Sequence, residues 1–253
     1  PHTGMEDVMA HDPVAVRPQS DREVVAELIE RYRLLAIPVT DEAGHLKGMV
    51  RFDEAMEAVR EEIGEDLTQM VGAGAEETVF TPIPVSVRWR LPWITFNLLI
   101  GLMLAFAIEP FRETIQEYPI LAALMPMVAL LGGNSGAQSQ AVIIRAMAIG
   151  DLPPGRAWRA VRREFAVGAI NGAAMSIMAG LVVALIAPDP DIGVVVGVAV
   201  FVSLLVAGLA GAGIPVIMRR LGLDPALASN IFLTMITDLV GFTGFLLTAT
   251  LLL

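Results

Sequence analysis

The chain contains no cysteine among its 253 residues, which excludes disulfide bonds and thiolate metal sites. Its three histidines, His2, His11 and His45, all lie in the first 45 residues, outside the long apolar segments. Neither an H-E-x-x-H nor a G-x-S-x-G motif occurs, and the serine of "GNSG" has no neighbouring base. We therefore do not expect an enzyme.

Charge is scarce in most of the chain. Residues 1–80 carry 18 acidic and 7 basic side chains, a net charge of −11, whereas residues 81–253 carry 9 and 10, a net charge of +1. Apolar residues make up 55% of the sequence and the mean hydropathy is +0.65, which is unusual for a soluble domain. The pattern predicts an acidic soluble domain that attracts divalent cations rather than nucleic acid, followed by a membrane domain.

The apolar residues form five segments, each long enough to cross a lipid bilayer, which takes a helix of about 20 residues. These predicted spans are 91–108, 118–149, 165–187, 192–218 and 225–253. The fold class expected is therefore an α-helical membrane protein with five transmembrane helices and a small N-terminal α/β module. The expected location is the cell (inner) membrane. Arginines gather before the first span and after the second and fourth, so the N-terminal domain is expected on the cytoplasmic side and the C-terminus on the external side. The basic stretch 153–165 is expected along the cytoplasmic interface.

The fifth span contains the only carboxylate deep within the membrane segments, Asp238. Asp224 and the proline after it predict the start of this helix, which places Asp238 about 21 Å along it. Asn230, Thr234 and Asp238 are spaced i, i+4, i+8 and form one polar stripe. Hydrogen bonding to a neighbouring helix would explain Asn230 and Thr234 alone. A membrane-buried acid indicates function, and no arginine or lysine lies deep in any span to neutralise it.

The second span adds more polar groups in "LLGGNSGAQSQAV" (130–142), among them Asn134. The glycines there permit either a close approach of helices or a broken helix. Carboxylate, amide and hydroxyl oxygens suit a hard cation, whereas the absence of histidine and cysteine disfavours soft metals. One carboxylate per chain is few for a divalent ion, so we expect a homodimer with two copies of Asp238 beside one path. Mg²⁺ loses water reluctantly, and the site would hold the hydrated ion.

The N-terminal residues resemble a CBS domain in "VMAHDPVAV" (8–16) and "LLAIPVTDEAGHLKGMV" (34–50). CBS domains usually occur in pairs, so a second module is expected before Pro1 or from a partner chain. Nucleotide-binding members carry a hydroxyl residue where this chain has Arg51, which disfavours nucleotide binding.

The membrane motifs "PMVALLGGNSGAQSQAV" (126–142) and "DPALASNIFLTMITDLVGF" (224–242) resemble those of the MgtE family of magnesium channels. The resemblance implies a homodimeric pore, with pore residues Asp238, Asn230 and Asn134. Two departures are Ala137, where the family often has asparagine, and Thr234, where a small residue is common.

An acidic helix, predicted after the CBS-like module, corresponds by resemblance to the family's plug helix, where bound Mg²⁺ favours closure. The candidate regulatory residues are Glu57, Glu61, Glu62, Glu65 and Asp66. A solvated acidic face is the simpler reading of such a charge run. The expected domains are a regulatory module at 1–56, a connecting helix and linker at 57–88, and a pore domain at 89–253.

Mg²⁺ is thus expected as both transported and regulatory ion. Two alternatives use the same segments. A sensor with a passive membrane anchor would be indifferent to replacement of Asp238, and a coupled Mg²⁺/Co²⁺ exporter or carrier would depend on a proton or sodium gradient.

Overall fold

A computed structural model describes residue 4, residues 13–227 and residues 229–253. The chain divides into two compact units, Pro1–Gly64 and Glu65–Leu253, and each is described by itself.

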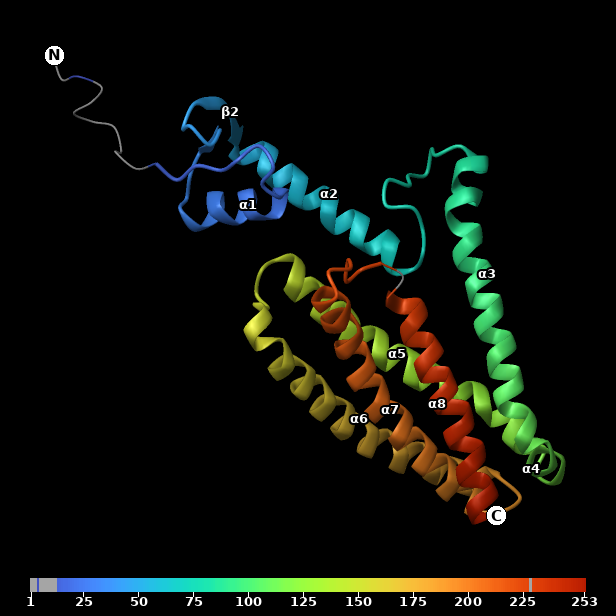
Figure 1. Ribbon diagram of the computed structural model, residues 1–253. Helices are drawn as coiled ribbons and strands as arrows, with labels where there is room; N and C mark the ends of the chain where they lie inside the picture. The colour runs from blue at the N-terminus through green and yellow to red at the C-terminus, as the bar shows by residue number, and fades with distance from the viewer. Residues whose placement is uncertain (1–3, 5–12, 228) are drawn as a thin grey trace. The chain divides into compact units, whose positions relative to one another are not determined.

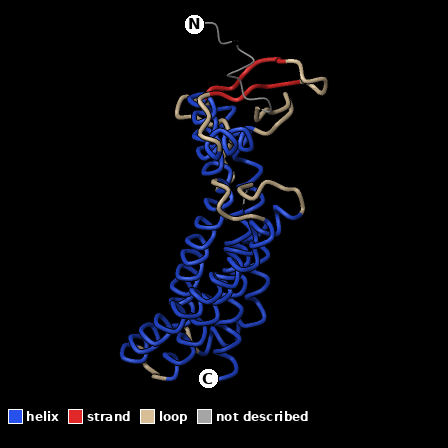
Figure 2. Tube along the Cα trace, turned by 90° about the vertical axis from the view of Figure 1, so that its left-hand side faces the viewer, coloured by secondary structure: helices blue, strands red, loops and turns tan. Residues whose placement is uncertain are grey.

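The first unit is a small α/β module, as the sequence predicts. The strands β1 and β2 form an antiparallel hairpin in which Ile37 lies opposite Val50, shown in red in Figure 2. Val16 bridges to Val39 in parallel, and Ile29 and Ile37 are fully buried in the centre of the module. The elements are α1 (Arg22–Arg31), β1 (Ala36–Thr40) and β2 (Leu46–Arg51).

The predicted acidic helix is present as α2 (Phe52–Met70). Its first turn carries Asp53 and Glu54, which interact favourably with the positive end of the helix dipole. Glu54 also accepts a hydrogen bond from the backbone N–H of Arg51 at 3.0 Å. The helix start is therefore satisfied locally, by residues of its own first turn.

The second unit contains five helices that are long and apolar enough to cross a membrane, counted over the described residues. This confirms the five predicted spans. Figure 1 shows α5, α6, α7 and α8 side by side, with α3 packed along α8. The elements are α3 (Ile83–Ile108), η2 (Glu109–Phe111), α4 (Arg112–Glu117), α5 (Ile120–Ala148), η3 (Pro154–Arg156), α6 (Ala157–Ile186), α7 (Asp191–Arg220) and α8 (Ser229–Leu252).

The central helix of the bundle is α7, which has the largest buried share of the five spans. It approaches α6 closely through glycines: a Cβ added to Gly208 would lie 2.6 Å from the carbonyl oxygen of Glu164. Phe245 and Leu246 of α8 are fully buried in the main apolar cluster, with Val195 and Val200 of α7. By contrast, no residue of α3 is buried within the described chain.

The structure corrects two details of the sequence analysis and settles an alternative. The helix α8 begins at Ser229 rather than at residue 225, because Asp224 instead accepts a hydrogen bond from the N–H of Ala226 at 2.8 Å and closes a turn. The basic stretch forms η3 and then runs without a break into α6, so it is the end of a spanning helix and not a separate interfacial one. The helix α5 is continuous across its glycines, which favours close packing over a broken helix.

Candidate metal-ion site in the membrane domain

The polar stripe of the fifth span lies on α8, where Asn230, Thr234 and Asp238 are all half-buried. With the helix starting at Ser229, Asp238 lies about 14 Å along it. The Thr234 hydroxyl donates to the carbonyl oxygens of Asn230 and Ile231, both at 3.0 Å. Because its proton is used within the helix, the lone pairs of Thr234 Oγ1 remain available as ligands.

No positive charge neutralises Asp238 within the part of the chain that the structure describes. The ion pairs among these residues do not include it. Those in the membrane unit lie at helix ends and in loops, for example Arg112 with Glu109 and Arg163 with Glu164. The chain therefore places an uncompensated carboxyl group at membrane depth, beside an amide and a hydroxyl on the same helix.

The register between α5 and α8 follows from two glycines of α5. A Cβ on Gly132 would lie 3.8 Å from the Cβ of Thr237, and one on Gly136 would lie 2.7 Å from Leu233. The two helices are thus antiparallel and in close contact, and Asn134 lies between these levels. The second-span motif and the α8 stripe share the same depth in the bundle.

Depth alone does not bring Asn134 to the stripe. Asn134 is two residues from each of the two glycines that face α8, which is about 200° around the helix, and its side chain is exposed. Gln138, one turn further on, is exposed as well. One chain therefore brings together Asn230, Thr234 and Asp238, while Asn134 lies on the outward face of α5. Exposed amides at this depth require a polar partner other than lipid.

Among the buried polar residues of the membrane unit, sequence reasoning missed Glu164 and Ser203 entirely. Glu164 of α6 is 4% exposed and pairs with the guanidinium of Arg163. Ser203 of α7 is 1% exposed. A single serine in the apolar run "FVSLL" gives little signal, but the glutamate after four arginines stands directly before the predicted span 165–187 and was open to detection there.

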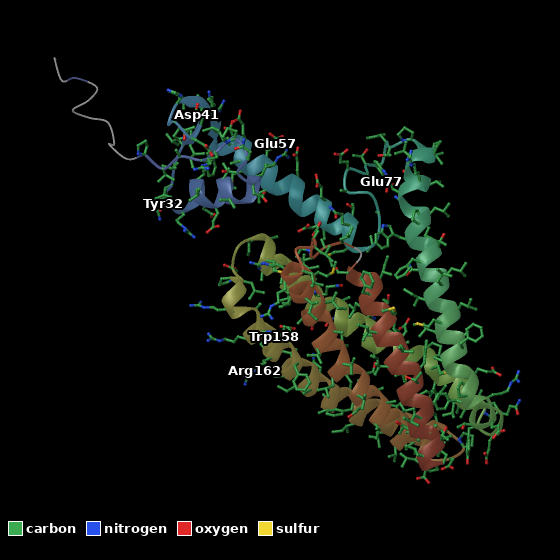
Figure 3. The ribbon with its side chains drawn as sticks, in the orientation of Figure 1. Tyr32, Asp41, Glu57, Glu77, Trp158 and Arg162 are labelled. Atoms are coloured by element: carbon green, nitrogen blue, oxygen red, sulfur yellow. The ribbon has the colours of Figure 1, made fainter. Side chains whose placement is uncertain are left out.

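The regulatory candidates lie on α2, with Glu57 labelled in Figure 3. Glu57 and Glu61 line a cavity of about 430 Å³ in the first unit, and Glu61 is 3.9 Å from Arg22 across it. Glu65 and Asp66 are half-buried, and the side chain of Glu62 lies outside those that are described. Within the described residues, no group of three or more acidic or histidine side chains is arranged to hold a metal ion.

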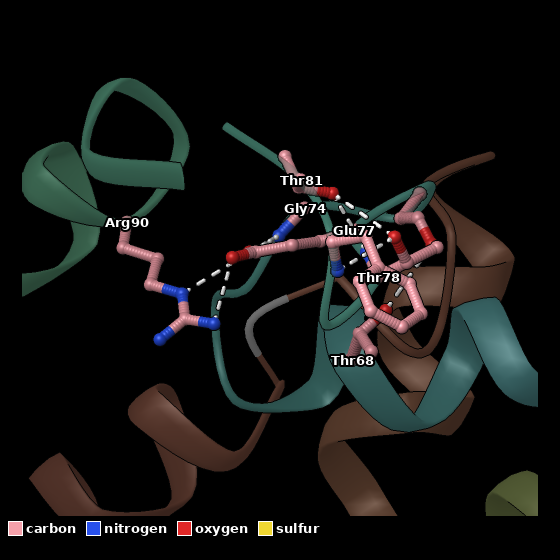
Figure 4. Close-up of polar contacts among 8 residues, drawn as sticks. Thr68, Gly74, Glu77, Thr78, Thr81 and Arg90 are labelled. Carbon is pink, nitrogen blue, oxygen red and sulfur yellow. Dashed lines mark hydrogen bonds and ion pairs between the residues drawn. The ribbon is translucent and has the colours of Figure 1, made fainter. Parts of the chain in front are cut away.

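The segment after α2 is fastened to α3 by an ion pair, drawn in Figure 4. The Glu77 carboxylate accepts from Arg90 Nη2 at 2.7 Å and Nε at 3.1 Å, and its side chain is 4% exposed. The pKa of Glu77 is lowered to about 2, mainly by hydrogen bonding to Arg90 and secondly by hydrogen bonding to Ser86. The loop also packs tightly, because a Cβ on Gly74 would lie 2.2 Å from the ring of Trp89. The acidic connection is therefore held at the start of the first membrane helix.

The basic end of the bundle carries an exposed Trp158 near the start of α6, labelled with Arg162 in Figure 3. The guanidinium of Arg220 lies 5.5 Å from the Trp158 ring centroid, within range of a cation–π interaction. Tryptophan is enriched where helices leave the bilayer, and arginine on the cytoplasmic side of it, so this end has the composition typical of a membrane interface.

Comparison with known proteins identifies both parts of the chain. Residues 125–248 match the family model for MgtE, described as a divalent cation transporter, and residues 5–61 match the CBS domain. All four predicted pore residues lie within the first match. Three curated relatives are named magnesium transporter MgtE, and each is 33% identical to this chain. The alignments cover 94% of the chain for Enterococcus faecalis, 95% for Bacillus subtilis and 100% for Thermus thermophilus.

The chain spans about half the length of these relatives, 52%, 53% and 56% respectively. The similarity nevertheless covers the membrane helices, the CBS module and the acidic connection between them. The order of a CBS module, an acidic helix and five spanning helices agrees with both family matches. The chain belongs to the MgtE family of divalent cation transporters.

Proposed function

We propose that this chain moves hydrated Mg²⁺ across the cell membrane as a homodimer, along a path beside α8. The observation that carries the proposal is the half-buried Asp238, which has no basic partner in the described chain and which shares its helix face with Asn230 and Thr234. The names of the three relatives, all magnesium transporters, support Mg²⁺ as the ion.

The two-fold partner supplies what one chain lacks. Two copies of Asp238 beside one path provide two negative charges for a divalent ion, which enters with most of its water. Amide and hydroxyl oxygens of Asn230 and Thr234 accept hydrogen bonds from that water. The outward amide of Asn134 then faces the partner subunit or the ion path. Either one surrounds the amide with polar groups, which the hydrocarbon of the bilayer does not supply.

The arginines at one end of the bundle orient the protein. Arg88 and Arg90 lie near the start of α3, the arginines from Arg156 to Arg163 at the start of α6, and Arg219 and Arg220 at the end of α7. The opposite ends carry Glu109, Asp189 and Asp191. By the positive-inside rule the N-terminal unit is cytoplasmic and the C-terminus external.

Flux of Mg²⁺ into liposomes tests the pathway. Asp238→Ala and Asp238→Asn should abolish most of the flux of the reconstituted protein, because neither variant supplies a negative charge. Asp191→Asn is the matched control: it removes a carboxylate from the exposed first turn of α7 and should conduct as the wild type does. Equal Mg²⁺ flux in the Asp238 variants and the wild type would mean that Asp238 has no part in an ion pathway, and it would favour a membrane domain that serves only as an anchor.

A coupled carrier on the same scaffold is the second candidate, favoured by the protonatable group at membrane depth. Flux measured with and without an imposed proton or sodium gradient separates the two. We expect flux driven by the Mg²⁺ gradient and the membrane potential alone. A strict requirement for either counter-gradient would establish the carrier.

Regulation by cytoplasmic Mg²⁺ is proposed for the acidic helix α2. Its carboxylates repel one another at low Mg²⁺, and cation binding relieves the repulsion and favours closure. Replacement of Glu57, Glu61, Glu62, Glu65 and Asp66 by the corresponding amides should leave flux high at Mg²⁺ concentrations that close the wild type. Unchanged Mg²⁺ dependence in that variant would refute a regulatory role for this helix.

A further inference from the structure

Ser203 is a buried hydroxyl to which neither the sequence motifs nor the proposed pathway assigns a role. It lies on α7 and is 1% exposed, and its Oγ has no hydrogen-bond partner within the described part of the chain. A buried hydroxyl without a partner costs free energy. An alanine would fill the position without that cost, so the oxygen itself calls for an explanation.

The oxygen lies between two glycines on two different helices. A Cβ built on Gly132 of α5 would be 2.3 Å from Ser203 Oγ, and one built on Gly241 of α8 would be 3.6 Å from it. An added Cβ takes the place of one Cα hydrogen, so the Ser203 oxygen lies over a Cα–H of Gly132. Contacts of the type Cα–H···O recur where helices pack closely. Ser203 of α7 thus contacts Gly132 of α5 and Gly241 of α8 at one point, and we call this three-residue contact the joint.

This joint lies next to the groups assigned to the ion. Gly132 is two residues from Asn134, and Thr237, whose Cβ is 3.8 Å from the same added Cβ, is next to Asp238. A change in the separation of α5 and α8 at this point moves both motifs relative to each other. Ser203 makes no hydrogen bond to either motif residue within the described chain, so any effect on them is through helix spacing.

We propose that Ser203 is a positioning residue: its hydroxyl, seated against Gly132 and Gly241, sets the separation of α5 and α8 at the level of Asp238. The inference rests on the proposed function. The fit accounts for glycine at residue 132, since any side chain there occupies the place of the Ser203 oxygen.

A pair of variants tests the joint by removing and restoring space. Gly132→Ala puts a methyl group 2.3 Å from Ser203 Oγ, too close for both to keep their places, so either the hydroxyl rotates out of its site or α5 moves away from α7 and α8; both outcomes disrupt the contact. Adding Ser203→Ala removes that oxygen, and the nearest remaining atoms, the Cβ atoms of residues 203 and 237, are then 3.6 and 3.8 Å away, ordinary contact distances. Gly133→Ala is the matched control, because no atom lies within 4 Å of its added Cβ.

Mg²⁺ flux into liposomes is measured per folded protein over a range of Mg²⁺ concentrations, together with thermal unfolding in detergent. Gly132→Ala should lower maximal flux about tenfold through overpacking and shift the Mg²⁺ concentration at half-maximal flux. The double variant should regain both values, and Gly133→Ala should match the wild type. A shift of the half-maximal concentration separates altered spacing from a mere loss of folded protein.

The inference is overturned if Gly132→Ala conducts as the wild type does, or if the double variant is no better than Gly132→Ala in flux and in half-maximal concentration. Should Gly132→Ala fail to accumulate, the double variant decides: recovery of folding and flux supports the joint, and failure overturns it. A wild-type protein without Mg²⁺ flux overturns the proposed function and this inference with it, whereas wild-type flux without rescue overturns the inference alone.

Discussion

The close contact between α6 and α7 gives the sharpest test of the packing. An added Cβ on Gly208 would be 2.6 Å from the carbonyl oxygen of Glu164 and 3.3 Å from the Cα of Gly168. These are backbone atoms that cannot rotate aside, so restoring an ordinary contact needs a helix displacement of about 0.8 Å, and overpacking of this kind costs about 1–3 kcal/mol. Gly208→Ala should therefore destabilise the bundle although alanine is the better helix former.

Gly213→Ala isolates that cost. Gly213 is buried on the same helix, five residues further on, but nothing lies within 4 Å of its added Cβ. Both variants gain the same helix propensity, about 1 kcal/mol at most, so the difference between them reports the packing alone. We expect Gly208→Ala to be less stable than Gly213→Ala by about 1–3 kcal/mol in reversible unfolding in mixed micelles. A difference below about 0.5 kcal/mol, the usual spread of neutral substitutions, would refute the close contact.

Three further predictions concern the loop before α3 and the apolar core. The pKa of Glu77 lies at about 2, below its ordinary value of 4.5, so its pairing with Arg90 stabilises the loop above pH 4.5 and is lost as the pH falls toward 2. The Glu77 carboxylate also accepts a hydrogen bond from the Gly74 amide at 3.2 Å, so hydrogen exchange of that amide should be slow at pH 6 in the wild type and faster in Glu77→Ala, and equal exchange rates would contradict this pairing. Gly74→Ala should displace the Trp89 ring, because the new Cβ lies 2.2 Å from it, and a tryptophan fluorescence spectrum identical to that of the wild type would speak against the contact. Phe245→Ala should cost about 3 kcal/mol or more in the unfolding assay, since this ring is fully buried, and a loss below about 1 kcal/mol would mean that the ring is not in the core.

The spans were predictable because hydrocarbon imposes a simple rule on sequence: a helix that crosses it needs an uninterrupted apolar run. The helix α7 satisfies that rule so fully that its bounds, Asp191–Arg220, lie within two residues of the predicted segment. Helix starts were less predictable. Asp224 and Pro225 have the residue types of a helix start, but Asp224 closes a turn with Ala226, and the helix begins five residues later. Local propensity does not decide between a turn and a first helical turn, since both use the same capping hydrogen bond.

The sequence by itself determined the class of protein: five apolar runs, an acidic module before them, and one carboxylate at membrane depth with no cation near it in the chain. These are properties of composition and of i, i+4 spacing, so Asn230, Thr234 and Asp238 were already known to share a face. Only the tertiary structure decided that Asn134 turns away from that face, that Glu77 holds the connection to Arg90, and that Ser203 lies between Gly132 and Gly241. The reason is physical: each of these depends on the rotation and separation of helices packed against one another, and a rotation of one residue, about 100°, changes the neighbour without changing the apolar pattern.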